Sequence, residues 1–92
     1  MEPSLLPAEN NPAVQLGLNI RLARVRAGYS RETLSKLSGL SMNYIGIVER
    51  GLKNITILNC QKLAEALGTN ICDLLDGVFN STANALNAIQ EE

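Results

Sequence analysis

The sequence predicts an all-α fold, a compact bundle of about five short helices. Residues that favour helix N-termini alternate along the chain with glycines that end helices. Between these signals, apolar residues recur three or four positions apart, the period of a buried helical face. The in-and-out alternation of a β-strand does not persist in any segment. Together these features indicate helices joined by short turns.

The composition fits one small domain. The chain has 92 residues, of which 46% are hydrophobic and 18% charged, a balance typical of globular proteins. Aromatic residues make up only 3%, so the core must consist mainly of aliphatic side chains. No apolar run is long enough to span a membrane, and the N-terminus lacks the pattern of a secretory signal. We therefore expect a cytoplasmic protein with no membrane partner.

The first helix is expected to begin after Asn11, whose side chain can cap it, with Pro12 at the first helical position. Gly28 ends this helix, because glycine adopts the left-handed backbone conformation at low cost. The positions expected on its buried face are Leu16, Ile20, Ala23 and Ala27.

The second helix is expected between Ser30, its cap, and Gly39, with Glu32 in the first turn where the helix dipole favours an acid. Leu34 and Leu37 are its expected core positions.

A third helix is expected to follow almost at once, capped by Ser41 and ended by Gly51, with Ile45 and Val48 facing inward. Two helices joined by a tight turn that contains glycine form a helix-turn-helix unit. The spacing alone is equally compatible with a purely structural helical hairpin. The side chains left on the outer face or its edges are Met42, Asn43, Tyr44, Gly46, Ile47 and Arg50.

Asn43 can pair with adenine through two hydrogen bonds, and apolar side chains can pack against thymine methyl groups. An ordinary surface helix would more often carry Lys and Glu at such positions. The mixture of polar and apolar groups on the third helix therefore suits the base edges of a major groove.

A fourth helix is expected between Thr56, its cap, and Gly68, and a short fifth helix begins at Asn70 with Asp73 in its first turn. The fourth helix has an apolar stripe of Ile57, Cys60, Leu63, Ala64 and Leu67, and the fifth turns Leu74 and Leu75 inward.

Residues 1–11 are expected to form a flexible N-terminal tail and residues 12–77 the folded domain. Residues 78–92 are either a C-terminal tail or a further amphipathic helix with Phe79, Ala83 and Leu86 on one face. Such a helix would complete the core or form a dimer contact, and both alternatives stay open.

The charge is unevenly distributed. Residues 1–54 carry seven basic and four acidic side chains, a balance of +3, and residues 55–92 carry one basic and five acidic side chains, a balance of −4. One end of the chain is therefore suited to an anionic partner although the net charge is −1.

The residue types argue against an enzyme, a metal site or a cofactor. The chain has no His, no Gly-rich phosphate loop and no cluster of carboxylates, so no usual acid–base or nucleophilic arrangement is visible. Cys60 and Cys72 form no CxxC pair, and Cys60 is best explained as a small apolar residue on a helix face.

The segment from Leu16 to Leu75 resembles the Cro and phage-repressor (Xre) family of helix-turn-helix proteins. The matching landmarks are LGLNIRLAR, GYSRETLSKLSGLS, YIGIVERG and KLAEALGTNICDLL. Within that family, MNYIGIVERGLKNITI is similar to the controller proteins of restriction–modification systems, which often have a Tyr-Ile pair and a following Asn-x-Thr. The resemblance implies a lambda-repressor-like domain that binds double-stranded DNA.

The resemblance also implies residue roles. Residues 41–50 match the recognition helix, and Arg24 and Glu49 match a partly buried ion pair between the first and third helices. Arg31 matches a position that touches the DNA backbone, where the family usually has Gln. The residues expected at the DNA are Arg31, Ser41, Met42, Asn43, Tyr44, Ile47, Arg50, Lys53 and Asn54.

These observations predict a transcriptional regulator, a repressor or an activator, that occupies a palindromic or pseudopalindromic operator and blocks or recruits RNA polymerase. A homodimer through residues 70–90 is expected, because one recognition helix reads only a few base pairs. The alternative is an antitoxin-type protein that binds a toxin partner and regulates its own operon.

Overall fold

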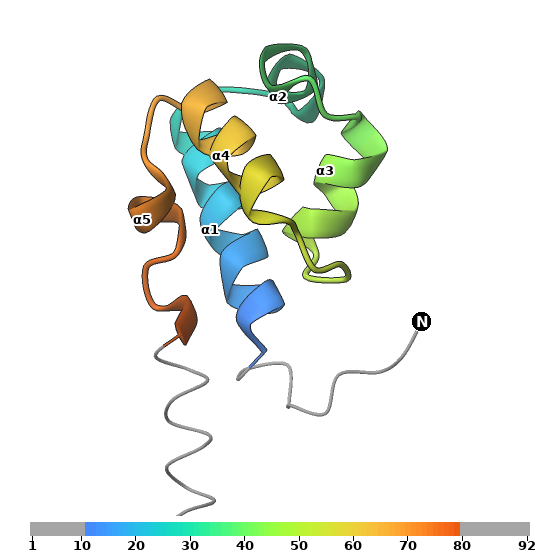
Figure 1. The fold of residues 1–92 in the computed structure, drawn as a ribbon. Helices are drawn as coiled ribbons and strands as arrows, with labels where there is room; N and C mark the ends of the chain where they lie inside the picture. The colour runs from blue at the N-terminus through green and yellow to red at the C-terminus, as the bar shows by residue number, and fades with distance from the viewer. Residues whose placement is uncertain (1–10, 80–92) are drawn as a thin grey trace, which may run out of the picture.

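The computed structural model describes residues 11–79, which form five helices and no strand. They are α1 (Pro12–Arg26), α2 (Arg31–Ser38), α3 (Met42–Glu49), α4 (Ile57–Ala66) and α5 (Ile71–Leu74) (Figure 1). The predicted all-α fold is therefore confirmed. The expectations for residues 1–10 and 80–92 lie outside the described residues.

Each helix begins at a polar residue that the sequence had indicated as its cap. The cap side chain accepts a hydrogen bond of 2.9–3.1 Å from a backbone N–H in the first turn, which satisfies one of the donors left free there. The five caps are Asn11, Ser30, Ser41, Thr56 and Asn70.

The turn between α2 and α3 depends on Gly39, which has a φ of 78°. A side chain with a Cβ would be strained in this left-handed conformation. Ser35 closes the turn from the preceding helix by donating its hydroxyl to the backbone oxygen of Leu40 at 2.5 Å. The reversal that the sequence predicted at this point is therefore fixed by backbone conformation and by a hydrogen bond.

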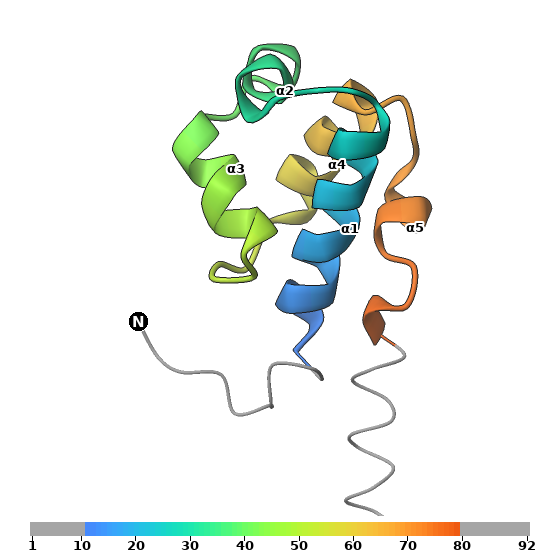
Figure 2. The ribbon, with the colours of Figure 1, turned by 180° about the vertical axis from the view of Figure 1, so that it is seen from behind.

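Helix α1 lies between α3 on one side and α5 on the other, and α2 packs across one end of the bundle against α3 and α4 (Figures 1 and 2). The buried core consists of Leu16, Ile20, Leu34, Ile45, Val48, Cys60, Leu63, Ala64, Leu74 and Val78. It extends one residue past the expected domain end at residue 77, because Val78 is only 2% exposed. Burial raises the pKa of the Cys60 thiol, which keeps it uncharged like its apolar neighbours.

Three residues predicted to face the core are exposed. Leu37 is 54% exposed because it lies in the last turn of α2, and Leu40, after the turn, packs against the core instead. Ala27 lies at the C-terminal cap of α1, beyond the last buried turn. Ile57 is 71% exposed because it is the first residue of α4, at the rim of the core.

Helices α1 and α3 approach each other closely at Gly17. A Cβ at this position would lie 2.7 Å from the backbone oxygen of Glu49 and closer still to that of Val48. Glycine at position 17 therefore allows the C-terminal end of α3 to rest directly on α1.

The same two helices are joined by a buried ion pair. Arg24 Nε lies 2.7 Å from Glu49 Oε2, and Arg24 also donates to the backbone oxygen of Tyr29 at 2.9 Å. The side chain of Glu49 is only 1% exposed, and its other oxygen, Oε1, accepts from Arg24 at 3.1 Å and from Arg31 at 3.2 Å. One carboxylate thus connects α1, the start of α2 and α3.

None of the helices within residues 11–79 is long and apolar enough to cross a membrane.

We expect Glu49→Ala to lower the free energy of unfolding by about 3 kcal/mol, because it leaves the guanidinium of Arg24 buried without its carboxylate. Urea denaturation measures the loss. Glu65→Ala, which removes an exposed carboxylate from α4, is the control and should change stability by less than about 0.5 kcal/mol. Equal stability of the two variants would contradict the structural role of the pair.

A pair of glycine substitutions tests the contact between α1 and α3. Gly17→Ala should lower the free energy of unfolding by at least about 2 kcal/mol, because backbone atoms of α3 occupy the space that the methyl group needs. Gly46→Ala is the matched control, because Gly46 is also helical and no atom of another element lies within 4 Å of the new Cβ. This substitution should raise the free energy of unfolding by up to about 1 kcal/mol. The same sign for both substitutions in urea denaturation would argue against the close contact.

Candidate nucleic-acid interface

Helix α3 has a buried face and an opposite, open face. Ile45 is fully buried and Val48 is 2% exposed, so these two anchor the helix to the core. Successive residues of a helix are rotated by about 100°, which places residues 43, 47 and 50 on the side opposite these anchors. Asn43 and Arg50 are exposed, and Ile47 is partly exposed. The open face of α3 thus carries an amide, an aliphatic group and a guanidinium.

Two further residues of the predicted recognition helix, Ser41 and Met42, lie at the edge of this face or at its beginning. Met42 is 50% exposed at the first position of α3. The hydroxyl oxygen of Ser41 accepts the N–H of Tyr44 at 3.0 Å, which leaves the hydroxyl proton of this exposed side chain available for an acceptor outside the helix. Arg50 donates to the backbone oxygen of Gly46 at 3.2 Å, so its side chain lies along the outer surface.

Tyr44 does not lie on the open face. It is partly buried against the core, and its hydroxyl oxygen accepts a hydrogen bond from Asn59 Nδ2 of α4 at 3.1 Å. The ammonium group of Lys53 lies 5.6 Å from the centre of its ring. The structure therefore places Tyr44 on the flank of α3 that faces α4, at an edge of the outer face that the sequence pattern predicted.

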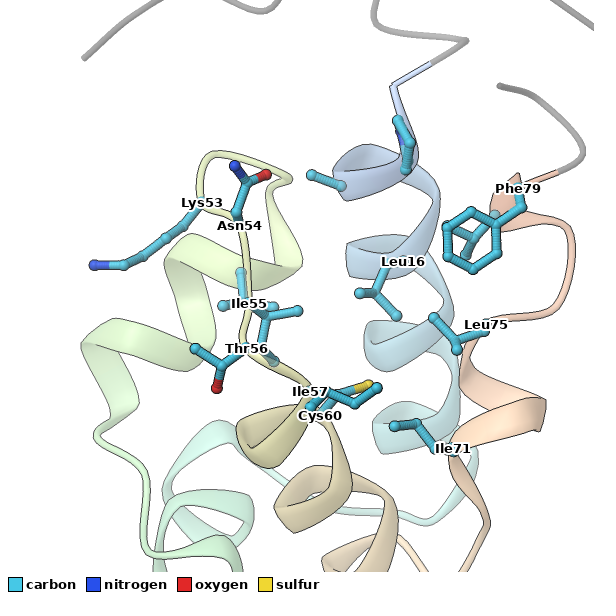
Figure 3. A pocket seen from close by; sticks show the side chains of 14 residues that line it. Leu16, Lys53, Asn54, Ile55, Thr56, Ile57, Cys60, Ile71, Leu75 and Phe79 are labelled. Carbon is cyan, nitrogen blue, oxygen red and sulfur yellow. The ribbon is translucent and has the colours of Figure 1, made fainter. Parts of the chain in front are cut away.

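Arg31, Lys53 and Asn54 border the open face. Arg31 is the first residue of α2, and its side chain remains 43% exposed although it donates to Glu49. Lys53 and Asn54 are exposed in the segment that links α3 to α4, and the side chain of Lys53 points away from α1 (Figure 3). The structure thus brings Arg31, Arg50 and Lys53 to the surroundings of one helix.

The charge around α3 differs from the charge at the opposite side of α1. The one acid of α3, Glu49, is buried and already paired with arginines. Asp73 and Asp76 are exposed in and just after α5, which lies on the other side of α1 (Figure 2). The surface around α3 is therefore better suited to a polyanion than the surface around α5.

An apolar groove of about 340 Å³ lies at the end of the bundle where α1 begins (Figure 3). Apolar side chains from α1, α4, α5 and the residues after α5 line it, among them Leu16, Ile57, Ile71, Leu75, Val78 and Phe79. Val48 of α3 and Lys53 and Asn54 of the following segment also line the groove. Of the lining residues, Ile57 is 71% exposed and Phe79 63%, so part of the groove is open to solvent. Isolated exposed apolar residues are common, whereas larger contiguous apolar patches mark interaction surfaces.

The sequence did not single out Asn59, which the structure places between α3 and α4. Its position in the first turn of a capped helix is visible in the sequence, but its contact with Tyr44 depends on how the two helices pack. Within residues 11–79, no group of three or more Cys, Asp or Glu side chains could hold a metal ion.

The chain is similar to several proteins of known family. The family described as "Helix-turn-helix" matches residues 20–74, which is more than half of the chain. The Neisseria hypothetical transcription factor from Neisseria meningitidis is 41% identical over 73 residues, which cover 79% of this chain and 69% of that protein. The control protein C.SmaI from Serratia marcescens is 42% identical over 60 residues, which cover 65% of this chain and 71% of that protein.

Two solved structures extend the comparison. The restriction–modification controller protein C.AhdI from Aeromonas hydrophila has a TM-score of 0.66 and 44% sequence identity, covering 67% of this chain and 94% of that chain. The structure of the Neisseria factor has a TM-score of 0.69 and 40% identity, covering 82% of this chain and 86% of that chain. The chain therefore belongs to the Xre-type helix-turn-helix family of DNA-binding transcription regulators.

Proposed function

We propose that the protein is a sequence-specific transcriptional regulator that binds a palindromic or pseudopalindromic operator as a homodimer. One observation carries the proposal: the open face of α3, with Asn43 and Ile47, is bordered by exposed cationic side chains. Base edges require hydrogen-bonding and apolar groups, and phosphates require positive charge. Both kinds of group occur together here.

In the proposed complex, α3 lies in the major groove. Asn43 donates and accepts hydrogen bonds at an adenine, and Met42 and Ile47 pack against thymine methyl groups. Arg50 reaches a guanine or a phosphate at the edge of the helix. Tyr44 supports this face from its flank, as its contacts with Asn59 and Lys53 suggest.

Phosphate contacts position the helix but do not select a sequence. We assign them to Arg31 and Lys53, together with Ser41 and Asn54. Glu49 holds the guanidinium of Arg31 beside α3 without burying it, since the side chain stays 43% exposed. A fixed cation loses less conformational entropy on binding a phosphate than a freely moving one.

The apolar lining of the groove and its surroundings are the proposed dimer surface, and Lys53 and Asn54, which line the same groove, stay outside the buried contact. Residues 70–90 were expected to form it, and the exposed side chains of Ile57 and Leu58 extend it onto α4. A two-fold arrangement would bury these residues against the same residues of a second copy and would direct both α3 helices toward DNA. The half-sites would then lie about one turn of DNA, roughly 34 Å, apart.

In this proposal the protein catalyses no reaction. It acts in the cytoplasm by occupying its operator, where it blocks or recruits RNA polymerase. C.SmaI and C.AhdI are named as controller proteins, which supports the finer proposal that this chain controls a restriction–modification system. The names of these relatives favour the regulator over the antitoxin-type alternative.

Selection from random duplexes at a stated salt concentration should yield a two-fold symmetric site. Asn43→Ala should lose about 1–3 kcal/mol of discrimination at one base pair in each half-site, because the amide that distinguishes adenine is gone. Gln61→Ala, which removes an exposed amide from α4, should select the same site as the wild type. Salt-sensitive binding with no preferred sequence would contradict the proposed function.

Ile57→Glu should convert the dimer to a monomer and weaken operator binding, because it places a charge in the apolar surface. The substitution should leave the fold intact, since an acid at the first position of a helix is favoured by the helix dipole. Sedimentation velocity measures the change. Val25→Glu alters a 58% exposed apolar residue on α1 and should remain dimeric. A monomeric wild type, or a dimeric Ile57→Glu protein, would rule out this interface.

A further inference from the structure

The side chain of Tyr44 is held by groups from outside its own helix. Asn59 Nδ2 donates to its hydroxyl oxygen at 3.1 Å, and Lys53 Nζ lies 5.6 Å from the centre of its ring. Asn59 belongs to α4, and Lys53 belongs to the segment between α3 and α4. One phenol ring therefore connects the recognition helix, the following loop and the next helix.

Asn59 is itself well fixed. Its backbone N–H donates to Thr56 Oγ1 at 3.1 Å as part of the cap of α4, and Cys60, the next residue, is 3% exposed in the core. The side-chain amide that reaches Tyr44 thus extends from a rigid first turn. The Tyr44 side chain is partly buried, and its hydroxyl oxygen accepts a hydrogen bond from Asn59. The position of α4 therefore determines the orientation of the Tyr44 ring.

Lys53 is the exposed member of the three. It lies in an exposed loop, and neither of the ion pairs within residues 11–79 involves it. A cation within about 6 Å of a ring centre is attracted by the π-electrons of the ring. The ring of Tyr44 is therefore the contact that keeps the ammonium of Lys53 beside α3.

We infer that Asn59 is a positioning residue for DNA binding, which orients Tyr44 so that the ring holds Lys53 ready for a DNA phosphate. The inference rests on the proposed function. It gives Asn59 a role although it does not touch the DNA, and it makes Tyr44 a support for the phosphate contact rather than a reader of bases.

The free protein provides the first test. The methylene protons of Lys53 next to Nζ should show an upfield NMR shift from the ring current of Tyr44. Asn59→Ala should reduce this shift, and Gln61→Ala, the matched amide control on α4, should leave it unchanged. An unchanged shift in Asn59→Ala would overturn the positioning role, whatever the protein binds.

The second test measures operator affinity over a series of salt concentrations. Asn59→Ala and Tyr44→Phe should each weaken binding about threefold to tenfold and should flatten the salt dependence toward that of Lys53→Ala, because a phosphate contact is weakened. In a Lys53→Ala background, Asn59→Ala should not reduce the operator affinity any further. The selected base sequence should stay the same in all of these variants.

Three results would overturn the inference: tighter binding by Asn59→Ala, full additivity of Asn59→Ala with Lys53→Ala, or an altered base preference in Tyr44→Phe. The first and third would mean that the phenol must leave Asn59 to contact the bases. If the wild type selects no sequence at all, the proposed function fails, and the NMR shift of Lys53 still decides whether Asn59 positions it.

Discussion

The Glu49 carboxylate is the interaction on which the arrangement of the helices depends. It accepts hydrogen bonds from Arg24 and Arg31, and Arg24 continues to the backbone oxygen of Tyr29. Burying a carboxylate destabilises the fold unless its oxygens accept hydrogen bonds. Because α3 provides the carboxylate and α1 and α2 provide the arginines, these three helices can move little relative to one another. This constraint fixes the angle at which α3 leaves the bundle. It also fixes the position of Arg31, the proposed phosphate contact, relative to that helix.

The close approach at Gly17 complements the ion pair. The ion pair limits the rotation of α3 about its own axis, because Glu49 lies at one end of the buried face. Gly17 determines how closely the end of α3 approaches α1. With Ile45 and Val48 buried on the same side, only the opposite side remains open. The face proposed to read DNA is thus determined by contacts made on the other face of the same helix. A change in the core could therefore alter DNA binding without touching any residue at the DNA.

Much of the fold could be predicted from the sequence, because the relevant signals are local. Caps such as Ser41 act within one turn, and Gly39 acts through its own backbone, so neither depends on distant residues. Burial at helix ends was predicted less well. The period of α4 includes Ile57, but the core ends before that residue is covered. The contact of Tyr44 with Asn59 was not predicted for a related reason: periodicity gives the direction of the Tyr44 side chain from α3, and only the packing of α4 reveals Asn59 beside it.

The first turn of α4 links the two surfaces of the proposed regulator. Ile57 lines the apolar groove, and Asn59, two residues later, contacts Tyr44 of the recognition helix. The cap by Thr56 stabilises this turn, so the path from the proposed dimer surface to α3 consists of one helical turn and one side-chain hydrogen bond. In a two-fold dimer of the proposed kind, the distance between the two α3 helices would depend on two such paths. A short and rigid path permits little variation in that distance, and an operator with altered half-site spacing could then be bound only by bending or twisting the DNA. Sequence discrimination would thereby include the spacing between half-sites as well as the bases that α3 contacts.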